Sequence, residues 1–367
     1  MRDGAAVHRG ELGILFFGGY DDRYPRNALI RKGWKKCGFP AVECRSPGDL
    51  KVHMRYPSLL WKFIRTKRRG RLMFVPDFRH KDVPIAWALS RATGMRLIFD
   101  PLVSRYETRV LDRGDVVEGT MQSRHNRNID RMSMTLPDLV LSDTDVHGDF
   151  YTEQFGLSHG RVKTLYGGAD EDLFAPVPLE RGSGRMNVLF YGSYLPLHGV
   201  ETIIDASGML PGEDVRFLLV GEGQTYNEMK GRAGLMSGAN VEFRPEVPAE
   251  QLRGLIGSAD IVLGVFGTTP KTAMVIPNKV YQALSVGRPV ITADNAAIRE
   301  VFQNGEHLMT VPAGDAAALA GAIETLRGDF GVRQRLANAG TQLVREEYSS
   351  IGVARRLAGI IEETGLL

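Results

Sequence analysis

Two lysines in the C-terminal half have the spacing of an anion-binding site. Lys271 and Lys279 stand on either side of Pro277, a residue that is favoured in the first turn of a helix. A helix beginning there would direct its unpaired backbone N–H groups and two ammonium groups toward one point, which suits a phosphate. The alternative is an amphipathic helix with a solvated lysine, because the residues after Lys279 have the spacing of a core-facing stripe.

Glycine-rich turns follow two apolar runs of the same half. The segments GSYLPLHG (192–199) and VGEGQ (220–224) each lie between an expected strand and an expected helix. Glycine lets the backbone approach a ligand closely, and His198 comes just before a helix N-terminus, where anions bind well. An ordinary turn with an exposed histidine is the alternative for the first segment, and a single Gly-x-Gly has little specificity for the second.

An Asp-x-Asp sequence and a histidine occur in the N-terminal half, in SDTDVHGD (142–149). Such a pair can chelate a metal ion. A turn from a strand to a helix also uses Asp or Thr as an ordinary N-cap, and we favour this interpretation.

Charge is unevenly distributed over the 367 residues. Residues 1–170 hold 29 Lys and Arg against 20 Asp and Glu, a net charge of +9, whereas residues 171–367 hold 17 against 23, a net charge of −6. The N-terminal half should therefore attract anions. We expect no nucleic acid partner, because no recognition module accompanies the charge.

The apolar runs are all far shorter than the roughly 20 residues that cross a bilayer. No charged and apolar leader opens the chain, so we expect a cytoplasmic protein. Cys37 and Cys44 lack the spacing of a zinc site or disulfide framework. The segment WKFIRTKRRGR (61–71) places six basic residues beside Trp61 and Phe63, a composition suited to peripheral contact with the inner membrane face; a solvated helix end is the alternative.

Short β-rich runs alternate with helical stretches along the chain, which predicts parallel sheets covered by helices. A turn-rich segment, 171–185, interrupts this alternation and is the expected linker between two α/β domains, 1–170 and 186–349. The expected strands are 12–17, 41–45, 71–76, 97–99, 138–142 and 162–166 in the first domain, and 187–193, 215–223, 240–247, 260–267, 289–294 and 308–312 in the second. In such doubly wound sheets, ligands bind outside the carboxyl ends of the strands.

Several of these segments together resemble a known family. YGGADEDLF (166–174), YGSYLPLHG, VGEGQ, IPNKVYQALSVGRPVI (276–291) and AIREVFQNGEHLMTVPAGD (297–315) are similar to the family 4 glycosyltransferases of GT-B architecture. LFFGGYDDRYPRN and FDPLVSRYET resemble one branch of it, in which the opening strand ends in a glycine turn. The resemblance implies two Rossmann-like domains facing across a cleft, with a C-terminal helix (350–367) that crosses back to the first domain.

The resemblance also implies a function. The C-terminal domain would hold a nucleotide diphosphate sugar, and the N-terminal domain would bind an acceptor, which could be a small molecule, a glycan or a lipid-linked molecule. Transfer would retain the anomeric configuration, with no metal and no other cofactor, because basic side chains and a helix N-terminus stabilise the departing diphosphate. The implied catalytic residues are His198, Lys271, Lys279 and Asp100, and the implied donor-binding residues are Gly18, Gly19, Gly192, Ser193, Gly221, Gly223, Arg244, Ile276, Asn278 and Gln282.

The chain departs from the family pattern at several of these positions. Ser193 and His198 stand where many members have arginine and lysine, and the paired glutamates would fall on Met274 and Gln282. Asp100 is the nearest candidate for the usual N-terminal catalytic histidine. Two alternatives to a transferase therefore stay open: a nucleotide-sugar-binding protein with impaired catalysis, and a sugar-nucleotide epimerase of the same fold.

Overall fold

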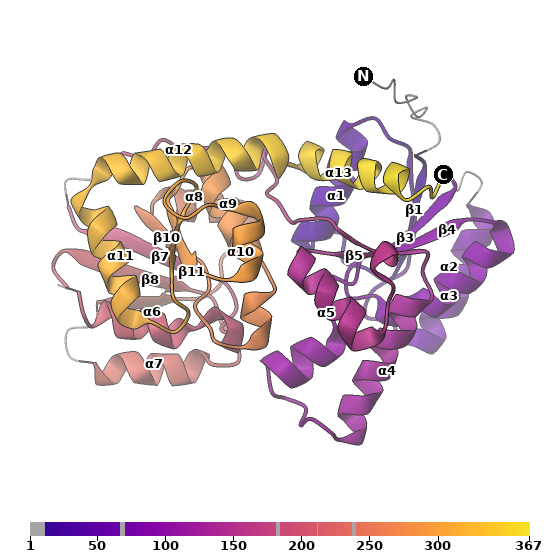
Figure 1. Ribbon diagram of the computed structural model, residues 1–367, viewed down its shortest axis with the longest axis horizontal. Coiled ribbons are helices and arrows are strands. Elements are labelled where there is room, and N and C mark those ends of the chain that lie inside the picture. Colours follow the sequence, from indigo (N-terminus) through magenta and orange to yellow (C-terminus); the bar gives the residue numbers. More distant parts are fainter. Residues whose placement is uncertain (1–11, 67–69, 181–183, 211, 237–239) are drawn as a thin grey trace. The chain divides into compact units, whose positions relative to one another are not determined.

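The computed structural model describes residues 12–66, 70–180, 184–210, 212–236 and 240–367. Their contacts divide the chain into two compact units, each an α/β unit with one six-stranded parallel sheet (Figure 1). Unit 1 holds the described chain up to Val110 together with Gly114–Tyr166 and Ser350–Leu367, and unit 2 holds Leu111–Arg113 and Gly167–Ser349. The predicted α/β fold with two doubly wound sheets is confirmed.

The sheet of unit 1 has the strand order β2-β1-β3-β4-β5-β6. Its strands are β1 (Ile14–Gly18), β2 (Ala41–Arg45), β3 (Leu72–Val75), β4 (Arg96–Phe99), β5 (Leu139–Ser142) and β6 (Val162–Thr164). Its helices are α1 (Pro25–Lys36), α2 (Val52–Arg65), η1 (His80–Asp82), α3 (Val83–Thr93), α4 (Met121–Thr135), α5 (Asp145–Phe155), η3 (His159–Arg161) and α13 (Ser350–Glu363). The π-helix η2 (Glu107–Asp112) begins in unit 1, and its last two residues are assigned to unit 2.

Alternate residues of the strands face two apolar layers. Ile14 and Phe16 of β1 pack with α1 and α13, whereas Leu15 and Phe17 pack with α2, α3 and α5. Every residue of β1 is buried, because helices cover both faces of the sheet. The sheet core thereby fixes where each strand ends.

The C-terminal helix α13 packs along α1 in unit 1 (Figure 1). Gly33 of α1 permits this close approach, since a Cβ atom at this position would lie 1.8 Å from the carbonyl oxygen of Ser350. Ala354 and Leu357 of α13 are fully buried in the same apolar layer. The predicted return of the last helix to the N-terminal domain is therefore observed.

The sheet of unit 2 has the order β12-β11-β10-β7-β8-β9. Its strands are β7 (Met186–Tyr191), β8 (Val215–Val220), β9 (Val241–Arg244), β10 (Ile261–Leu263), β11 (Val290–Ala293) and β12 (Met309–Val311). Its helices are η4 (Pro196–His198), α6 (Val200–Ser207), α7 (Tyr226–Leu235), α8 (Ala249–Gly257), η5 (Pro270–Ala273), α9 (Asn278–Val286), α10 (Ala296–Val301), α11 (Ala316–Gly328) and α12 (Phe330–Glu347). The strands of both units overlap the twelve segments that the sequence predicts.

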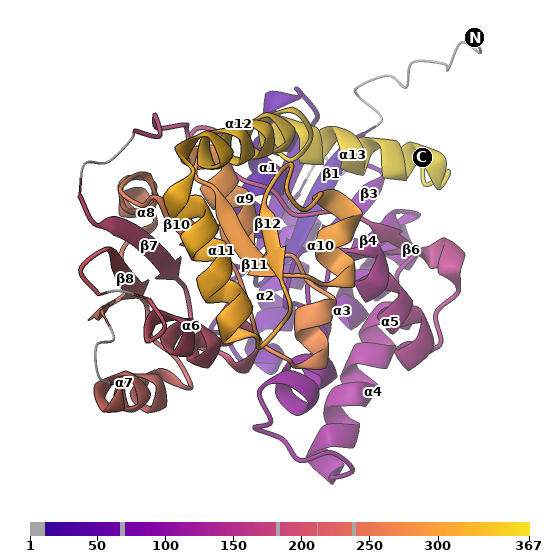
Figure 2. The same cartoon turned by 60° about the vertical axis from the view of Figure 1, so that its left-hand side comes forward.

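Helices cover both faces of the second sheet as well. Helices α6 and α11 lie against each other on one face, and α8, α9 and α12 contribute to the apolar layer on the other (Figure 2). The described part of the expected linker 171–185 belongs to unit 2, where carbonyl groups of Ala175 and Val177 accept hydrogen bonds from Arg253 and Arg288. Residues 181–183 of that segment lie outside the described residues. No helix among the described residues has the length and apolarity to cross a membrane.

Candidate functional site

Two glycine turns meet at the carboxyl ends of the central strands β7 and β8. Gly192 and Gly221 both have φ angles near the edge of the region reserved for glycine, at 134° and 133°. A Cβ atom on Gly221 would lie 2.1 Å from the carbonyl oxygen of Gly192. The glycines therefore let the two turns pack against each other at the edge where doubly wound sheets bind ligands.

Lys279 extends from the first turn of α9 toward this edge. Its side chain is buried, and its Nζ atom has no hydrogen-bond partner among the described residues. Nζ lies 3.8 Å from the centroid of the Phe190 ring, and a Cβ atom on Gly192 would lie 3.2 Å from it. Burial holds the pKa of Lys279 well below its usual value.

His198 lies beside Lys279 and shares its environment. Burial and, secondly, the nearby lysine hold the pKa of His198 well below its usual value, so the imidazole is neutral at neutral pH. Its Nδ1 atom contacts the carbonyl oxygen of Ser193, which only a protonated Nδ1 can hydrogen-bond. Nε2 then carries the lone pair and would become a donor on taking up a proton.

The loop after β10 places Lys271 next to the segment that carries His198. The backbone N–H of Phe266 donates to the carbonyl of His198 at 3.0 Å, and the hydroxyl of Thr272 donates to the carbonyl of Leu197 at 3.3 Å. Lys271 itself is buried in η5. The structure thus gathers the segments of three predicted catalytic residues, Lys271, His198 and Lys279, in one region of unit 2.

Gln282 follows Lys279 by three residues on α9 and is held by a residue of β7. The hydroxyl of Tyr191 donates to Oε1 of Gln282 at 2.9 Å and also lies 3.3 Å from the carbonyl oxygen of Lys279. Burial raises the pKa of Tyr191 well above its usual value, so the hydroxyl remains a donor. The side-chain oxygen of Gln282 therefore already accepts a hydrogen bond from within the protein.

The remaining predicted donor-binding residues of unit 2 have different surroundings. Helix α9 begins at Asn278 with Pro277 as its N-cap, one residue later than predicted. The side chain of Ile276 packs in the apolar core, which leaves its backbone for any ligand contact. Arg244 lies at the end of β9, where its Nε atom donates to Glu242 at 2.5 Å.

In unit 1, Gly18 and Gly19 follow β1, as the resemblance implies. The backbone N–H of Gly19 donates to Oδ2 of Asp82 at 2.9 Å, and Arg55 donates to the other oxygen of this carboxylate at 2.7 Å. The amide of Gly19 therefore has an internal partner. These two glycines lie in unit 1, whereas the other predicted donor-binding residues lie in unit 2.

Asp100 follows β4 and forms a buried ion pair with Arg26 of α1. The Nε atom of Arg26 lies 2.6 Å from Oδ2 of Asp100, and both side chains are almost inaccessible to solvent. Oδ1 of Asp100 and one terminal nitrogen of Arg26 lack a hydrogen-bond partner among the described residues. Burial raises the pKa of Asp100, although Arg26 opposes this shift.

Asp77 is a candidate that the sequence analysis missed. It follows β3, the neighbour of β4 in the sheet, and its Oδ1 atom is buried without a hydrogen-bond partner among the described residues. Burial and, secondly, Asp100 raise the pKa of Asp77 to about 8. The signal was available, because Asp77 and Asp100 are both the first carboxylates after buried strands.

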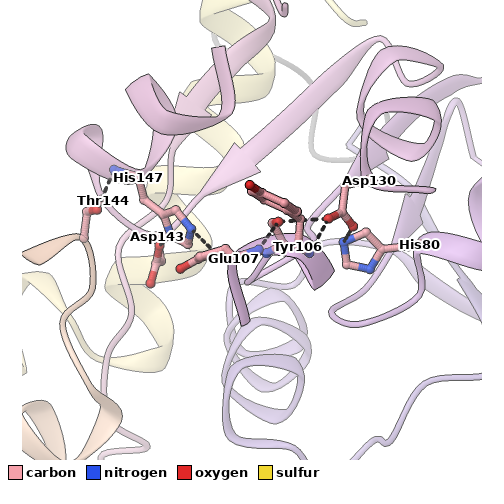
Figure 3. Close-up of polar contacts among 8 residues, drawn as sticks. His80, Tyr106, Glu107, Asp130, Asp143, Thr144 and His147 are labelled. Atoms are coloured by element: carbon pink, nitrogen blue, oxygen red, sulfur yellow. Dashed lines mark hydrogen bonds and ion pairs between the residues drawn. The ribbon is translucent and has the colours of Figure 1, made fainter. Parts of the chain in front are cut away.

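A buried polar network lies beyond β5 in unit 1 (Figure 3). His147 contacts Asp143 through Nδ1 and Glu107 through Nε2, the latter at 3.0 Å. Burial lowers the pKa of His147, but Glu107 and Asp143 more than compensate and raise it to about 10. The protonated imidazole therefore balances two buried carboxylates.

The network continues through the loop before η2 (Figure 3). The hydroxyl of Ser104 and the backbone N–H of Tyr106 donate to Asp130 at 2.9 and 2.7 Å. Nε2 of His80 lies 3.5 Å from Oδ1 of Asp130, and burial lowers the pKa of His80 to about 3. These contacts join α4 and η1 to the loop that precedes the π-helix.

The Asp-x-Asp segment is used for folding contacts. Thr144 is the N-cap of α5, and its side chain accepts a hydrogen bond from the backbone N–H of His147, which confirms the N-cap interpretation. Asp143 contacts His147, whereas Asp145 accepts a hydrogen bond from Tyr166 at 3.3 Å. Over the described ranges, no group of three or more His, Cys, Asp and Glu side chains is suited to hold a metal ion.

Comparison with known proteins finds similarity to glycosyltransferases. Residues 185–329 match the family model described as glycosyl transferases group 1. The chain is 27% identical over 298 residues to the phosphatidyl-myo-inositol mannosyltransferase of Mycobacterium leprae, covering 78% of this chain and 73% of the relative. It is 25% identical over 329 residues to the alpha-D-kanosaminyltransferase of Streptomyces kanamyceticus, covering 84% and 82%.

Solved structures show the same fold. HepE from Anabaena, solved in complex with UDP, superposes with a TM-score of 0.69 at 15% identity, covering 96% of this chain and all of HepE. The sucrose-phosphate synthase of Thermosynechococcus elongatus gives 0.71 at 16% identity, covering 96% and 98%. Fold and sequence matches together define a glycosyltransferase of the GT-B type, and they confirm the resemblance to family 4.

Proposed function

We propose that this protein is a retaining glycosyltransferase that takes a sugar from a nucleotide diphosphate sugar held by unit 2. The acceptor is held by unit 1. The observation that carries the donor site is the buried amino group of Lys279, which has no hydrogen-bond partner among the described residues and lies beside Gly192 and His198. The complexes of HepE with UDP and with UDP-glucose support a nucleotide sugar as the donor class.

The proposed role of these basic groups is to stabilise the departing diphosphate. Negative charge grows on the leaving oxygen as the bond to the sugar breaks, and preorganised donors lower the barrier to that step. Lys279 would supply a cation and His198 a proton-dependent donor, while Lys271 and the N-terminus of α9 would bind further phosphate oxygens. A buried ammonium without a partner needs an anion, which makes Lys279 the central residue of this proposal.

The acceptor would bind at the carboxyl ends of β3 and β4. Asp77 and Asp100 there have buried oxygens without hydrogen-bond partners among the described residues, and acceptor hydroxyl groups could donate to them. Asp100 is proposed as the catalytic residue of this unit and Arg26 as the group that keeps it ionised. One relative is named for phosphatidyl-myo-inositol and the other only for the kanosaminyl group that it transfers, so the acceptor class is taken broadly as a hydroxyl compound: a small molecule, a glycan or a lipid-linked molecule.

The basic residues are proposed to replace a divalent cation. If so, transfer measured in EDTA should equal transfer measured with added Mg²⁺ or Mn²⁺. The variant Asp143→Ala should keep measurable transfer, because Asp143 contacts His147 in the buried polar network. Activity that disappears in EDTA and returns with Mn²⁺ would overturn the metal-independent proposal.

One experiment separates the three candidate functions. The purified chain is incubated with UDP-, GDP-, ADP- and TDP-sugars, with and without a panel of acceptors, and free nucleotide and sugar products are measured. A transferase releases nucleoside diphosphate faster when its acceptor is present. An impaired binding protein is stabilised thermally by a nucleotide but releases none, and an epimerase converts the donor sugar without an acceptor.

A further inference from the structure

Helix α2 of unit 1 presents an apolar stripe outward. Met54, Leu60, Trp61 and Ile64 are exposed, and the last two residues are 56% and 67% exposed. Counted from Met54 these positions are i, i+6, i+7 and i+10, and at 3.6 residues per turn they lie within about 120° of one another, on one face of the helix. The opposite face is apolar too, since Leu59 and Phe63 are buried in the core beneath α2.

This arrangement corrects the membrane segment expected from sequence. Phe63 is a core residue, and the ammonium group of Lys62 donates to the carbonyl of Arg45 at 2.5 Å, so neither faces outward. Residues 67–69 of the expected segment lie outside the described residues. The outward apolar surface of α2 therefore consists of the α2 stripe, and α3 carries a further exposed aromatic residue, Trp87, which is 37% exposed.

The charged residues on α2 and α3 are all basic. Helices α2 and α3 contain no Asp or Glu, and no acidic residue occurs between Asp49 and Asp77. Exposed Lys51 and Arg65 lie at the two ends of α2, and the guanidinium of Arg65 lies 4.2 Å from the centroid of the Trp61 ring. Nearby Asp138 is engaged by Arg91 and Arg96.

We propose that the α2 stripe, Met54, Leu60, Trp61 and Ile64, docks on an anionic lipid bilayer surface. Large apolar side chains together with cations suit the boundary between lipid headgroups and acyl chains, where tryptophan is favoured and basic groups meet lipid phosphates. A helix that is apolar on its outer as well as its inner face needs an apolar partner there. Because α2 and α3 carry basic residues and no carboxylates, the partner that complements their charge is an anionic membrane.

The test is sedimentation of the full chain with vesicles of phosphatidylcholine alone and of phosphatidylcholine mixed with phosphatidylglycerol. The wild type should bind the mixed vesicles, and binding should weaken as salt is raised. The double variant Trp61→Ser/Ile64→Ser should bind at least about tenfold more weakly, because two large apolar side chains leave the interface. Leu235→Ser, a change at an 88% exposed leucine of unit 2, is the matched control and should bind as the wild type does.

Three results would overturn the proposal: no binding of the wild type to mixed vesicles, equal binding to neutral vesicles, or unchanged binding of the double variant. Sedimentation velocity tests a second copy as the occupant. If the stripe mediates a dimer, the double variant becomes monomeric, and the wild type does not bind vesicles. Nucleotide binding by unit 2 is measured separately, so failure of membrane docking is distinguishable from failure of the proposed transferase function.

Discussion

The Nζ atom of Lys279 lies 3.8 Å from the centroid of the buried Phe190 ring, and no hydrogen-bond acceptor among the described residues reaches it. The ring favours the charged ammonium by a cation–π interaction, whereas burial disfavours it. Burial dominates, since the pKa of Lys279 lies well below its usual value. A bound diphosphate would reverse this balance, because an anion beside Nζ favours the charged form.

Replacing Lys279 by methionine should keep the fold and reduce transfer. Methionine preserves the apolar contact with Phe190 but removes the donor to the leaving group, a loss that typically costs about 10²-fold or more in rate. Turnover of the nucleotide sugar by this variant is compared with turnover by Lys230→Met, a change at an exposed lysine of α7. Near wild-type turnover in Lys279→Met would refute the assignment of the leaving-group site.

Donor binding should be accompanied by proton uptake. The pKa values of Lys279 and His198 are lowered in the free protein, and a diphosphate beside them raises both, so the complex holds more protons near neutral pH. Affinity for the nucleotide sugar should accordingly fall as pH rises through this window. Calorimetric titration in buffers with different ionisation enthalpies measures the uptake, which Lys279→Met should reduce; an uptake of zero in the wild type would contradict the proposed contact.

The charged His147 should stabilise unit 1 below alkaline pH. Its pKa is raised to about 10 in the folded protein, above the ordinary 6.5, so its contribution is complete below 6.5 and is lost as pH rises through 10. Removing it by His147→Ala leaves two buried carboxylates without their cation and should cost about 3–5 kcal/mol.

Tryptophan fluorescence during urea unfolding measures this effect in unit 1 alone, because Trp34, Trp61 and Trp87 are the three tryptophans of the chain. The exposed His159 provides the control, His159→Ala. If His147→Ala unfolds at the same urea concentration as this control, the three groups do not form the proposed charge balance.

The variant Gln282→Glu should bind nucleotide more tightly, by up to about 1 kcal/mol. A carboxylate accepts charge-assisted hydrogen bonds from ribose hydroxyls, and the Tyr191 hydroxyl and nearby Lys279 would help to keep it ionised. Calorimetric titration of both proteins with the preferred nucleotide decides the sign. Weaker binding would mean that the new charge repels the diphosphate and that position 282 does not contact the ribose.

A second substitution tests how much the Tyr191 hydroxyl contributes to the expected affinity of Gln282→Glu. In Tyr191→Phe the amide of Gln282 loses its internal donor, and the side chain is free to rotate. Combining Tyr191→Phe with Gln282→Glu shows whether the hydroxyl and the new carboxylate act together, since non-additive changes in affinity report direct coupling.

The alternation of apolar strands and turns was sufficient to predict two doubly wound parallel sheets, with strands at twelve sites of the sequence. Local pattern determines this much, because a buried parallel strand needs a short apolar run and a turn needs glycine or a polar cap. The segment 142–149 is an example: its place between a strand and a helix was enough to predict an Asp or Thr N-cap, and Thr144 is the residue that caps α5. The spacing of Lys271 and Lys279 around Pro277 likewise predicted a phosphate site there, and this stays a prediction.

Only the tertiary structure decides which side chains of the site are buried, hydrogen-bonded or charged. Tyr191 reaches Gln282 across 91 positions of the chain, and Glu107 reaches His147 across 40, and no local pattern encodes such pairs. Whether Lys279 is charged depends on its burial beside Phe190. Which residues of α2 face outward likewise depends on the fold, which places Phe63 in the core. Strand and helix formation depend on neighbours in sequence, whereas burial, pairing and pKa depend on neighbours in space.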